Sequence, residues 1–214
     1  MMKKLLLTAI LMGLTSVTLA SEDEKASTPA WESDAWDTEL ANMPKGSVAK
    51  GEKLANKGYC YTCHGEKGIA PTGNAPSLAG LTSPWLYKTL LDYKSHLFHI
   101  DNKSLVMEAA VQPMSKQDMS DIAVYYATQK RPAGEGKIKA PRKVRKCQKC
   151  HDTDEPDEDD APSLLGQSAQ YIERQTEAYK HKVRRTEVGK SMHKAVKKLK
   201  KKKIKKLADY YADQ

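Results

Sequence analysis

Two short stretches of the chain follow one pattern: CYTCH at residues 60–64 and CQKCH at residues 147–151. In each stretch two residues separate a pair of cysteines, and a histidine directly follows the second cysteine. Together the two stretches contain all four cysteines of the 214-residue chain. No cysteine is left over, and the shared pattern suggests that both pairs serve the same chemistry.

Three chemistries use such cysteines. Two disulfides are the ordinary use of four cysteines in an exported chain, and zinc binds sets of Cys and His ligands. Neither explains why a histidine follows the second cysteine twice. The pattern C-x-x-C-H attaches c-type haem, because the two thiols form thioethers to the porphyrin and the adjacent histidine binds the iron. The sequence therefore predicts two covalently bound haem c groups. The predicted haem attachment and iron-binding residues are Cys60, Cys63 and His64, and Cys147, Cys150 and His151.

The sequence around the two stretches repeats with an offset of 85 to 87 residues, which indicates one haem module written twice. APSLAG at residues 75–80 returns as APSLLG at 161–166, and residues 107–129 return as 192–214. We expect a first domain over residues 47–134 and a second over residues 135–214.

Each iron needs a second axial ligand, for which Met and His are the usual candidates. Met107 and Met192 occupy equivalent positions, each 18 residues before the first tyrosine of a Tyr-Tyr pair, and are the predicted ligands. His193 is the rival for the second iron. His96 and His99 are weaker rivals for the first, because neither has a histidine counterpart in the second repeat.

A histidine that binds a metal usually donates its other ring N–H to an oxygen, which fixes the orientation of the ring. Pro76 and Pro162 follow the two predicted histidine ligands by 12 and 11 residues. We assign the accepting carbonyl groups to these two prolines. An ordinary turn proline is the alternative.

The pattern of apolar residues predicts an all-α protein, and nothing alternates as a sheet would. The predicted helices cover residues 48–57, a segment opened by Ser83 as the cap with Pro84 in the first turn, 115–129, 169–184 and 201–213. The second repeat's opening helix looks truncated, because Pro141 lies six residues before Cys147.

The beginning of the chain predicts export. Residues 1–20 combine two lysines, a short apolar run and small residues before the cut, as signal peptides do. Residues 21–46 form an acidic extension in which Trp31 and Trp36 either dock or belong to a mobile tail. The mean hydropathy of −0.68 excludes a polytopic membrane protein.

With these motifs in place, the chain from about residue 46 onward resembles the dihaem cytochromes c of the c-four family, which are tandem class I cytochrome c domains, each wrapped around one covalent haem. The resemblance is carried by the two C-x-x-C-H stretches, by A-P-S-L-x-G, by the two methionines, and by IAVYY at 122–126 and LADYY at 207–211. It implies His/Met ligation of both irons and a periplasmic electron carrier of a respiratory chain that feeds a terminal oxidase or a similar acceptor.

Positive charge is concentrated in the second half. Residues 21–135 contain 12 Lys+Arg and 15 Asp+Glu, a charge of −3, whereas residues 136–214 contain 22 and 12, a charge of +10. Lysines dominate residues 194–206. A solvated helix face is the simplest reading, but such a run also suits an acidic redox partner or an anionic membrane surface. Export and haem argue against nucleic acid.

The expected function is electron transfer without catalysis, since an iron with six ligands has no open position for a substrate. One alternative is an electron-transfer subunit of a larger dehydrogenase, such as the dihaem subunit of a sulfide-oxidising flavocytochrome, which the layout also resembles. A second alternative is a haem enzyme or sensor with one open iron. The sequence leaves the donor, the acceptor, the potentials and the oligomeric state undetermined.

Overall fold

The computed structural model describes residues 34–98, 100–151, 161–184, 186 and 189–214. The predicted signal peptide at 1–20 lies outside these residues, as do Trp31 and His99. Every regular element within the described ranges is helical, which confirms the predicted all-α class. The elements are α1 (Asp34–Ala41), α2 (Val48–Lys57), α3 (Tyr61–His64), the 3-10 turn η1 (Glu66–Gly68), α4 (Ser83–Lys94), α5 (Asn102–Val111), α6 (Lys116–Ala127), α7 (Arg145–His151), α8 (Ala169–Lys180), α9 (Gly189–Val196) and α10 (Lys201–Ala212).

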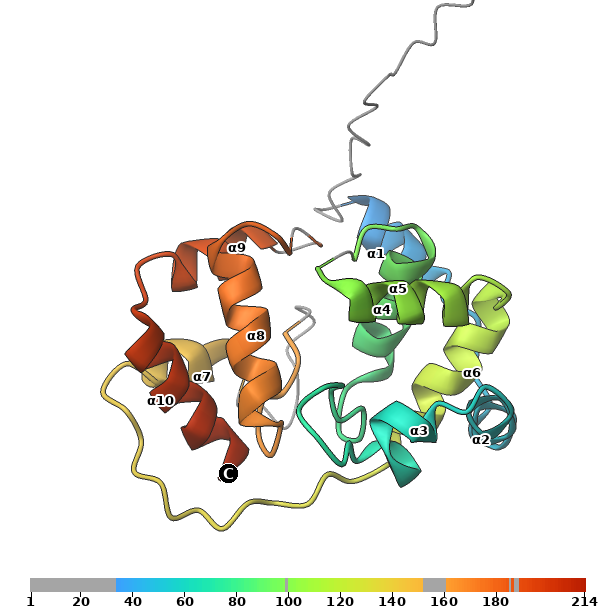
Figure 1. The fold of residues 1–214 in the computed structure, drawn as a ribbon. Helices are drawn as coiled ribbons and strands as arrows, with labels where there is room; N and C mark the ends of the chain where they lie inside the picture. Colours follow the sequence, from blue (N-terminus) through green and yellow to red (C-terminus); the bar gives the residue numbers. More distant parts are fainter. Residues whose placement is uncertain (1–33, 99, 152–160, 185, 187–188) are drawn as a thin grey trace, which may run out of the picture.

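The helices form two groups, which we call the first module (residues 34–129) and the second module (residues 144–214) (Figure 1). The extended segment between them, residues 130–143, runs along one side of both groups (Figure 1). Among the described residues, no helix is long and apolar enough to cross a membrane.

The first module is built on the crossing of α2 and α6. Gly51 lies at this crossing, where a Cβ atom would come within 1.9 Å of the backbone oxygen of Asp121, so the approach requires glycine. Ser47 caps α2, and its N–H donates to Asp121 Oδ1 at 2.7 Å. The buried core is formed by Ala55, Leu81, Trp85, Leu86, Tyr87, Leu91, Met119, Ile122, Ala123, Tyr125 and Tyr126.

The segment before α2 is hydrogen-bonded to α4 and α6 of the first module. Glu39 on α1 accepts hydrogen bonds from the Tyr87 hydroxyl at 2.9 Å and from Lys116 Nζ at 2.7 Å. The Ser120 hydroxyl donates to the Pro44 carbonyl. The described part of the acidic extension from Thr38 onward thus contacts the helices that follow it, while docking by Trp31 and Trp36 stays a prediction.

The second module has a smaller described core, in which α8 packs against α9 and α10. No helix is present between residues 128 and 144, so the predicted truncation of its opening helix is confirmed. Its buried core is formed by Val144, Ile172, Leu207, Ala208, Tyr210 and Tyr211.

Several helix ends differ from the prediction: α6 ends at Ala127 rather than residue 129 and α10 at Ala212 rather than residue 213. The cap of α4 is Thr82 rather than Ser83, because Thr82 has extended backbone angles and its side chain accepts from Trp85 N–H. A helix tolerates proline at either of its first two positions, so Pro84 is compatible with a cap at Thr82 or at Ser83. Helix α8 ends at Lys180 rather than Arg184, because the chain enters a left-handed turn at Lys182, where φ is 57°.

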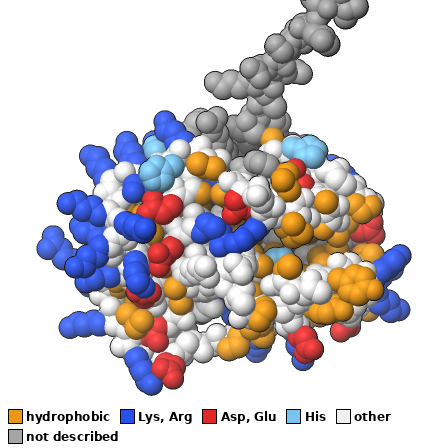
Figure 2. All heavy atoms as spheres, viewed as in Figure 1, with side chains coloured by type: hydrophobic (Ala, Val, Ile, Leu, Met, Phe, Trp, Pro, Cys, Tyr) orange, Lys and Arg blue, Asp and Glu red, His pale blue; other side chains and the backbone are white. Residues whose placement is uncertain are grey.

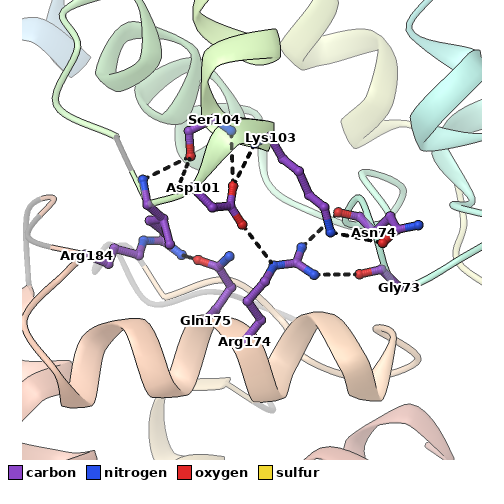
Figure 3. A network of polar contacts seen from close by, with 9 residues as sticks. Gly73, Asn74, Asp101, Lys103, Ser104, Arg174, Gln175 and Arg184 are labelled. Carbon is purple, nitrogen blue, oxygen red and sulfur yellow. Dashed lines mark hydrogen bonds and ion pairs between the residues drawn. The ribbon is translucent and has the colours of Figure 1, made fainter.

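The modules are joined by side chains that cross from one to the other. Arg174 on α8 donates to the carbonyl oxygens of Gly73 at 2.9 Å and Asn74 at 2.8 Å (Figure 3). Its Nε also lies 3.8 Å from a carboxylate oxygen of Asp101, the N-cap of α5. A single arginine of the second module thus holds a loop and a helix start of the first.

A second crossing point is the guanidinium group of Arg184. It lies 4.3 Å from the ring centroid of Phe98 in the first module and 4.7 Å from that of Tyr179 in its own module. Its Nη1 donates to Gln175 Oε1 at 2.8 Å (Figure 3). Arg184 is 86 residues after Phe98, so equivalent positions of the repeat meet across the interface in a cation–π contact.

Candidate haem-binding sites

The first site is organised around His64, which is 6% exposed at the end of α3. Its Nδ1 lies 2.9 Å from the Pro76 carbonyl oxygen. A carbonyl only accepts, so Nδ1 carries the hydrogen and Nε2 of the neutral ring keeps its lone pair. Burial lowers the pKa of His64, opposed by the Pro76 hydrogen bond. His64 is therefore neutral and has a nitrogen available for a metal.

The second site repeats this geometry. His151 ends α7, is 8% exposed, and has Nδ1 at 2.8 Å from the Pro162 carbonyl oxygen. A carbonyl only accepts, so Nδ1 of His151 carries the hydrogen of this bond. Both hydrogen bonds expected from the sequence are thus present, while ligation of iron by the two histidines stays a prediction.

All four cysteines are free thiols, which excludes the disulfide alternative. In each module the first cysteine of the pair is half-buried and the second is exposed. Burial raises the pKa of Cys60, which packs against the first core, and keeps this thiol protonated. In both modules two cysteines outside any disulfide directly precede a buried histidine whose Nδ1 is hydrogen-bonded, and this arrangement fits the attachment of haem c.

The two predicted methionine ligands lie on helices that the sequence analysis did not identify. Met107 is half-buried on α5 and Met192 is half-buried on α9. Asp101 and Ser104 form a capping box at the start of α5, and this D-x-x-S pattern was a signal for that helix. Ligation by the two methionines stays a prediction.

The rival histidines already have partners in the structure. His96 is exposed, and its Nδ1 lies 2.9 Å from Glu108 Oε2. His193 has Nδ1 at 3.1 Å from the Tyr179 carbonyl oxygen, which leaves its Nε2 uncommitted by this bond. His99 lies outside the described residues. His193 therefore stays the stronger rival.

Comparison with known proteins matches the cytochrome c family over residues 48–130. The chain is 36% identical over 94 residues to cytochrome c4 of Stutzerimonas stutzeri, which covers 40% of this chain and 45% of that protein. It is 32% identical over 84 residues to cytochrome c-554(548) of Halomonas halodenitrificans, covering 39% of this chain and 98% of that protein. The chain thus matches less than half the length of the cytochromes c4 in sequence.

Solved structures are similar over a longer range. Reduced recombinant cytochrome c4 from Pseudomonas stutzeri superposes with a TM-score of 0.66 and 29% identity, over 79% of this chain and 99% of the other. The thiosulfate dehydrogenase TsdBA from Marichromatium purpuratum has a TM-score of 0.58 at 22% identity, over 77% of this chain and 40% of the other, a likeness of fold alone.

Two buried histidines, each hydrogen-bonded through Nδ1 to a proline carbonyl and each directly following a pair of cysteines outside any disulfide, define a protein that binds haem covalently at two sites. The chain belongs to the cytochrome c family, and its tandem all-α architecture is that of the dihaem cytochromes c4. Its cofactors are two covalently attached haem c groups.

Proposed function

We propose that this protein is a dihaem electron carrier. The observation that supports this most is the repeated hydrogen bond from His64 to Pro76 and from His151 to Pro162, which prepares the same iron-binding nitrogen in both modules. When bound, each haem supplies an iron that accepts and releases one electron. The domain boundary falls near residues 134 and 135 in this proposal.

The residues proposed to bind the two irons favour electron transfer over catalysis. When haem is bound, His64 and His151 would hold the two irons through Nε2, and Met107 and Met192 would hold them through sulfur. A thioether ligand raises the reduction potential. Six ligands at each iron leave no position for a substrate, so we propose no catalytic activity.

We propose further that the protein works in the periplasm and passes electrons to a terminal oxidase or a similar acceptor of a respiratory chain. The export signal predicted at residues 1–20 supports this compartment. Lysines of α9, α10 and the segment between them form an exposed, positively charged surface on the second module, coloured blue in Figure 2. This surface suits docking onto an acidic redox partner, because complementary charge mainly accelerates encounter. Contact with an anionic membrane surface is the other use we propose for it.

A second candidate function is an electron-transfer subunit of a larger dehydrogenase. The likeness of fold to the thiosulfate dehydrogenase favours this possibility over a haem sensor. Copurification of a flavoprotein or another catalytic subunit would favour the subunit over the free carrier.

The decisive test is the optical spectrum of the purified protein with haem counted per chain. We expect two haems, a long-wavelength ferric band from methionine sulfur at full strength, and no binding of carbon monoxide. Met107→Ala and Met192→Ala should each remove half of that band and open one iron to carbon monoxide. If Met192→Ala leaves the band unchanged, His193→Ala identifies or excludes the rival ligand. Ready binding of carbon monoxide by the unaltered protein would contradict the carrier proposal.

The docking surface is tested by the dependence of electron transfer on ionic strength. We expect Lys201→Gln, Lys202→Gln and Lys206→Gln together to slow transfer to an acidic acceptor at low salt. The matched control replaces Lys50, Lys53 and Lys57, which are exposed on α2, and should have a smaller effect. A rate that does not respond to salt would exclude electrostatic steering.

A further inference from the structure

Gln167 is a buried polar residue of the second module that reaches into the first. It is 3% exposed and follows Gly166 in the loop before α8. Its Oε1 accepts a hydrogen bond from Ser77 N–H at 2.9 Å, and its Nε2 donates to the Ser77 carbonyl oxygen at 2.9 Å. Because a backbone N–H only donates and a carbonyl only accepts, the orientation of this amide is determined by its partners.

The Ser77 N–H belongs to the same peptide group as the Pro76 carbonyl. That carbonyl oxygen accepts the hydrogen bond from His64 Nδ1 at 2.9 Å. Gln167 and His64 therefore bind opposite ends of a single peptide bond, although 103 residues separate them in sequence. A hydrogen bond donated by the N–H of a peptide polarises the group and makes its carbonyl a stronger acceptor.

This arrangement is rigid and shielded from water. Gln167 Oε1 also accepts from Ser168 N–H at 3.1 Å, which holds the amide from its own module. Ser77 is 5% exposed, and its hydroxyl accepts from Ala70 N–H at 3.1 Å. Hydrogen bonds are electrostatically stronger in such surroundings than in water, so the polarisation is not lost to solvent.

The repeat does not provide the reverse contact. The position equivalent to Gln167 is Leu81, 86 residues earlier, which is 7% exposed in the first core. A leucine side chain has no hydrogen-bonding group. The coupling through this position therefore runs in one direction, from the second module to the histidine of the first.

We propose that Gln167 is a positioning residue for the first haem: through the Pro76–Ser77 peptide it orients the His64 ring and strengthens the hydrogen bond from Nδ1. The proposal rests on the proposed ligation of iron by His64. A stronger bond from Nδ1 gives the imidazole more anionic character and makes Nε2 a better donor to the metal. Such a ligand favours the ferric state, so docking of the second module lowers the potential of the first haem.

The test replaces Gln167 by methionine, which has the same length and no hydrogen-bonding amide, and by leucine, the residue at position 81. In the holoprotein a redox titration followed by NMR gives the midpoint potential of each haem. We expect the potential of the first haem to rise in both variants and that of the second to stay unchanged. The ring Nδ1–H resonance of His64 in the ferrous protein should move upfield, because its hydrogen bond is weaker.

Two control variants separate this role from general loosening of the interface. Arg174→Met removes hydrogen bonds to Gly73 and Asn74 without touching the Pro76–Ser77 peptide. Ser77→Ala removes the bond to Ala70 but keeps the peptide N–H. Both should shift the first potential less than Gln167→Met does.

Equal shifts at both haems, or an unchanged His64 resonance in Gln167→Met, would overturn the proposal. Should neither Gln167 variant retain two haems, the unaltered protein decides: the Nδ1–H resonance of His64 should lie downfield of that of His151, and an upfield or equal position counts against the coupling. An unaltered protein that lacks a histidine-ligated first haem would instead contradict the proposed function.

Discussion

The two modules descend from one repeated sequence but are supported differently. The main described cluster of buried hydrophobic residues has eleven members in the first module and six in the second. In the first, α6 begins with a capping box formed by Ser115 and Asp118. The equivalent positions in the second are Lys200 and Lys203, and α10 begins without a side-chain cap. The stability of the second module therefore depends more on its haem and on the neighbouring module than the stability of the first module does.

The segment that replaces the missing helix of the second module illustrates this difference. In the first module α2 packs across α6, but the corresponding stretch before α7 is extended. It is held at the end of α10 instead: Gly134 N–H donates to the Gln214 carbonyl oxygen at 3.0 Å and Gly136 N–H donates to that of Asp213 at 2.7 Å. A packed helix buries apolar side chains in a core, whereas these backbone hydrogen bonds hold the segment in place without burying such side chains.

The largest expected effect follows from removing one haem. Cys147→Ala with Cys150→Ala should leave the second module largely unfolded, because the porphyrin supplies apolar bulk that six buried residues do not. Circular dichroism should show a loss of helix, and hydrogen exchange should locate that loss in α8 to α10.

The matched pair, Cys60→Ala with Cys63→Ala, sharpens the comparison. The first module has α2 and the larger described core, so it should retain more of its helix without haem. Equal losses in the two pairs, or a cooperative melt with unchanged helicity in the Cys147→Ala, Cys150→Ala variant, would contradict the asymmetry.

The next effect concerns the contact that only the first module has. Gly51→Ala would place a Cβ atom 1.9 Å from the Asp121 backbone oxygen and force α2 away from α6. We expect the free energy of unfolding of the first module to fall by about 1–3 kcal/mol. Thermal melting of the first module measures this, and Glu52→Ala, an exposed neighbour, is the control. A melting temperature equal to that of the control would show that the crossing tolerates a side chain.

The class, the repeat and the histidine–proline pairs could be predicted from the sequence, because similar motifs recur at a nearly constant offset of 85 to 87 residues. His64 was paired with Pro76 because a metal-binding histidine usually donates to an oxygen and because the repeat places Pro162 similarly after His151; the structure contains the His64–Pro76 hydrogen bond. Helix α5 was not identified because its apolar residues do not gather on one face. Helix α9 was missed although its apolar residues do gather on one face, because it is only eight residues long. The Gln167 contact could not be foreseen, because it depends on how two modules pack and not on any local pattern.

A smaller effect is expected from transferring the cap of α6 to α10. Lys200→Ser with Lys203→Asp would supply a hydroxyl acceptor and a carboxylate where lysines now face the positive end of the helix dipole. We expect the second module to gain about 1 kcal/mol in its free energy of unfolding. Hydrogen exchange in α10 measures the gain, and the charge-matched variant Lys202→Ser with Lys206→Asp is the control. A gain of the same size in the control would assign the effect to net charge.

The smallest effect distinguishes the two helix starts by pH. Hydrogen bonds from the Ser115 side chain and backbone lower the pKa of the exposed Asp118 carboxyl group. A carboxyl group whose pKa is lower in the folded state stabilises the fold above its ordinary pKa of about 4. That contribution is lost as the pH falls from the ordinary value through the lowered one, because over this range the unfolded chain binds more protons than the folded one. Asp118→Asn should reduce the loss of hydrogen-exchange protection that α6 shows on acidification. The effect should be less than about 1 kcal/mol, because the Ser115–Asp118 pair is open to solvent. Helix α10, with Lys203 at the equivalent position, should show no matching loss, so an equal acid response of the two helices would show that the cap does not cause it.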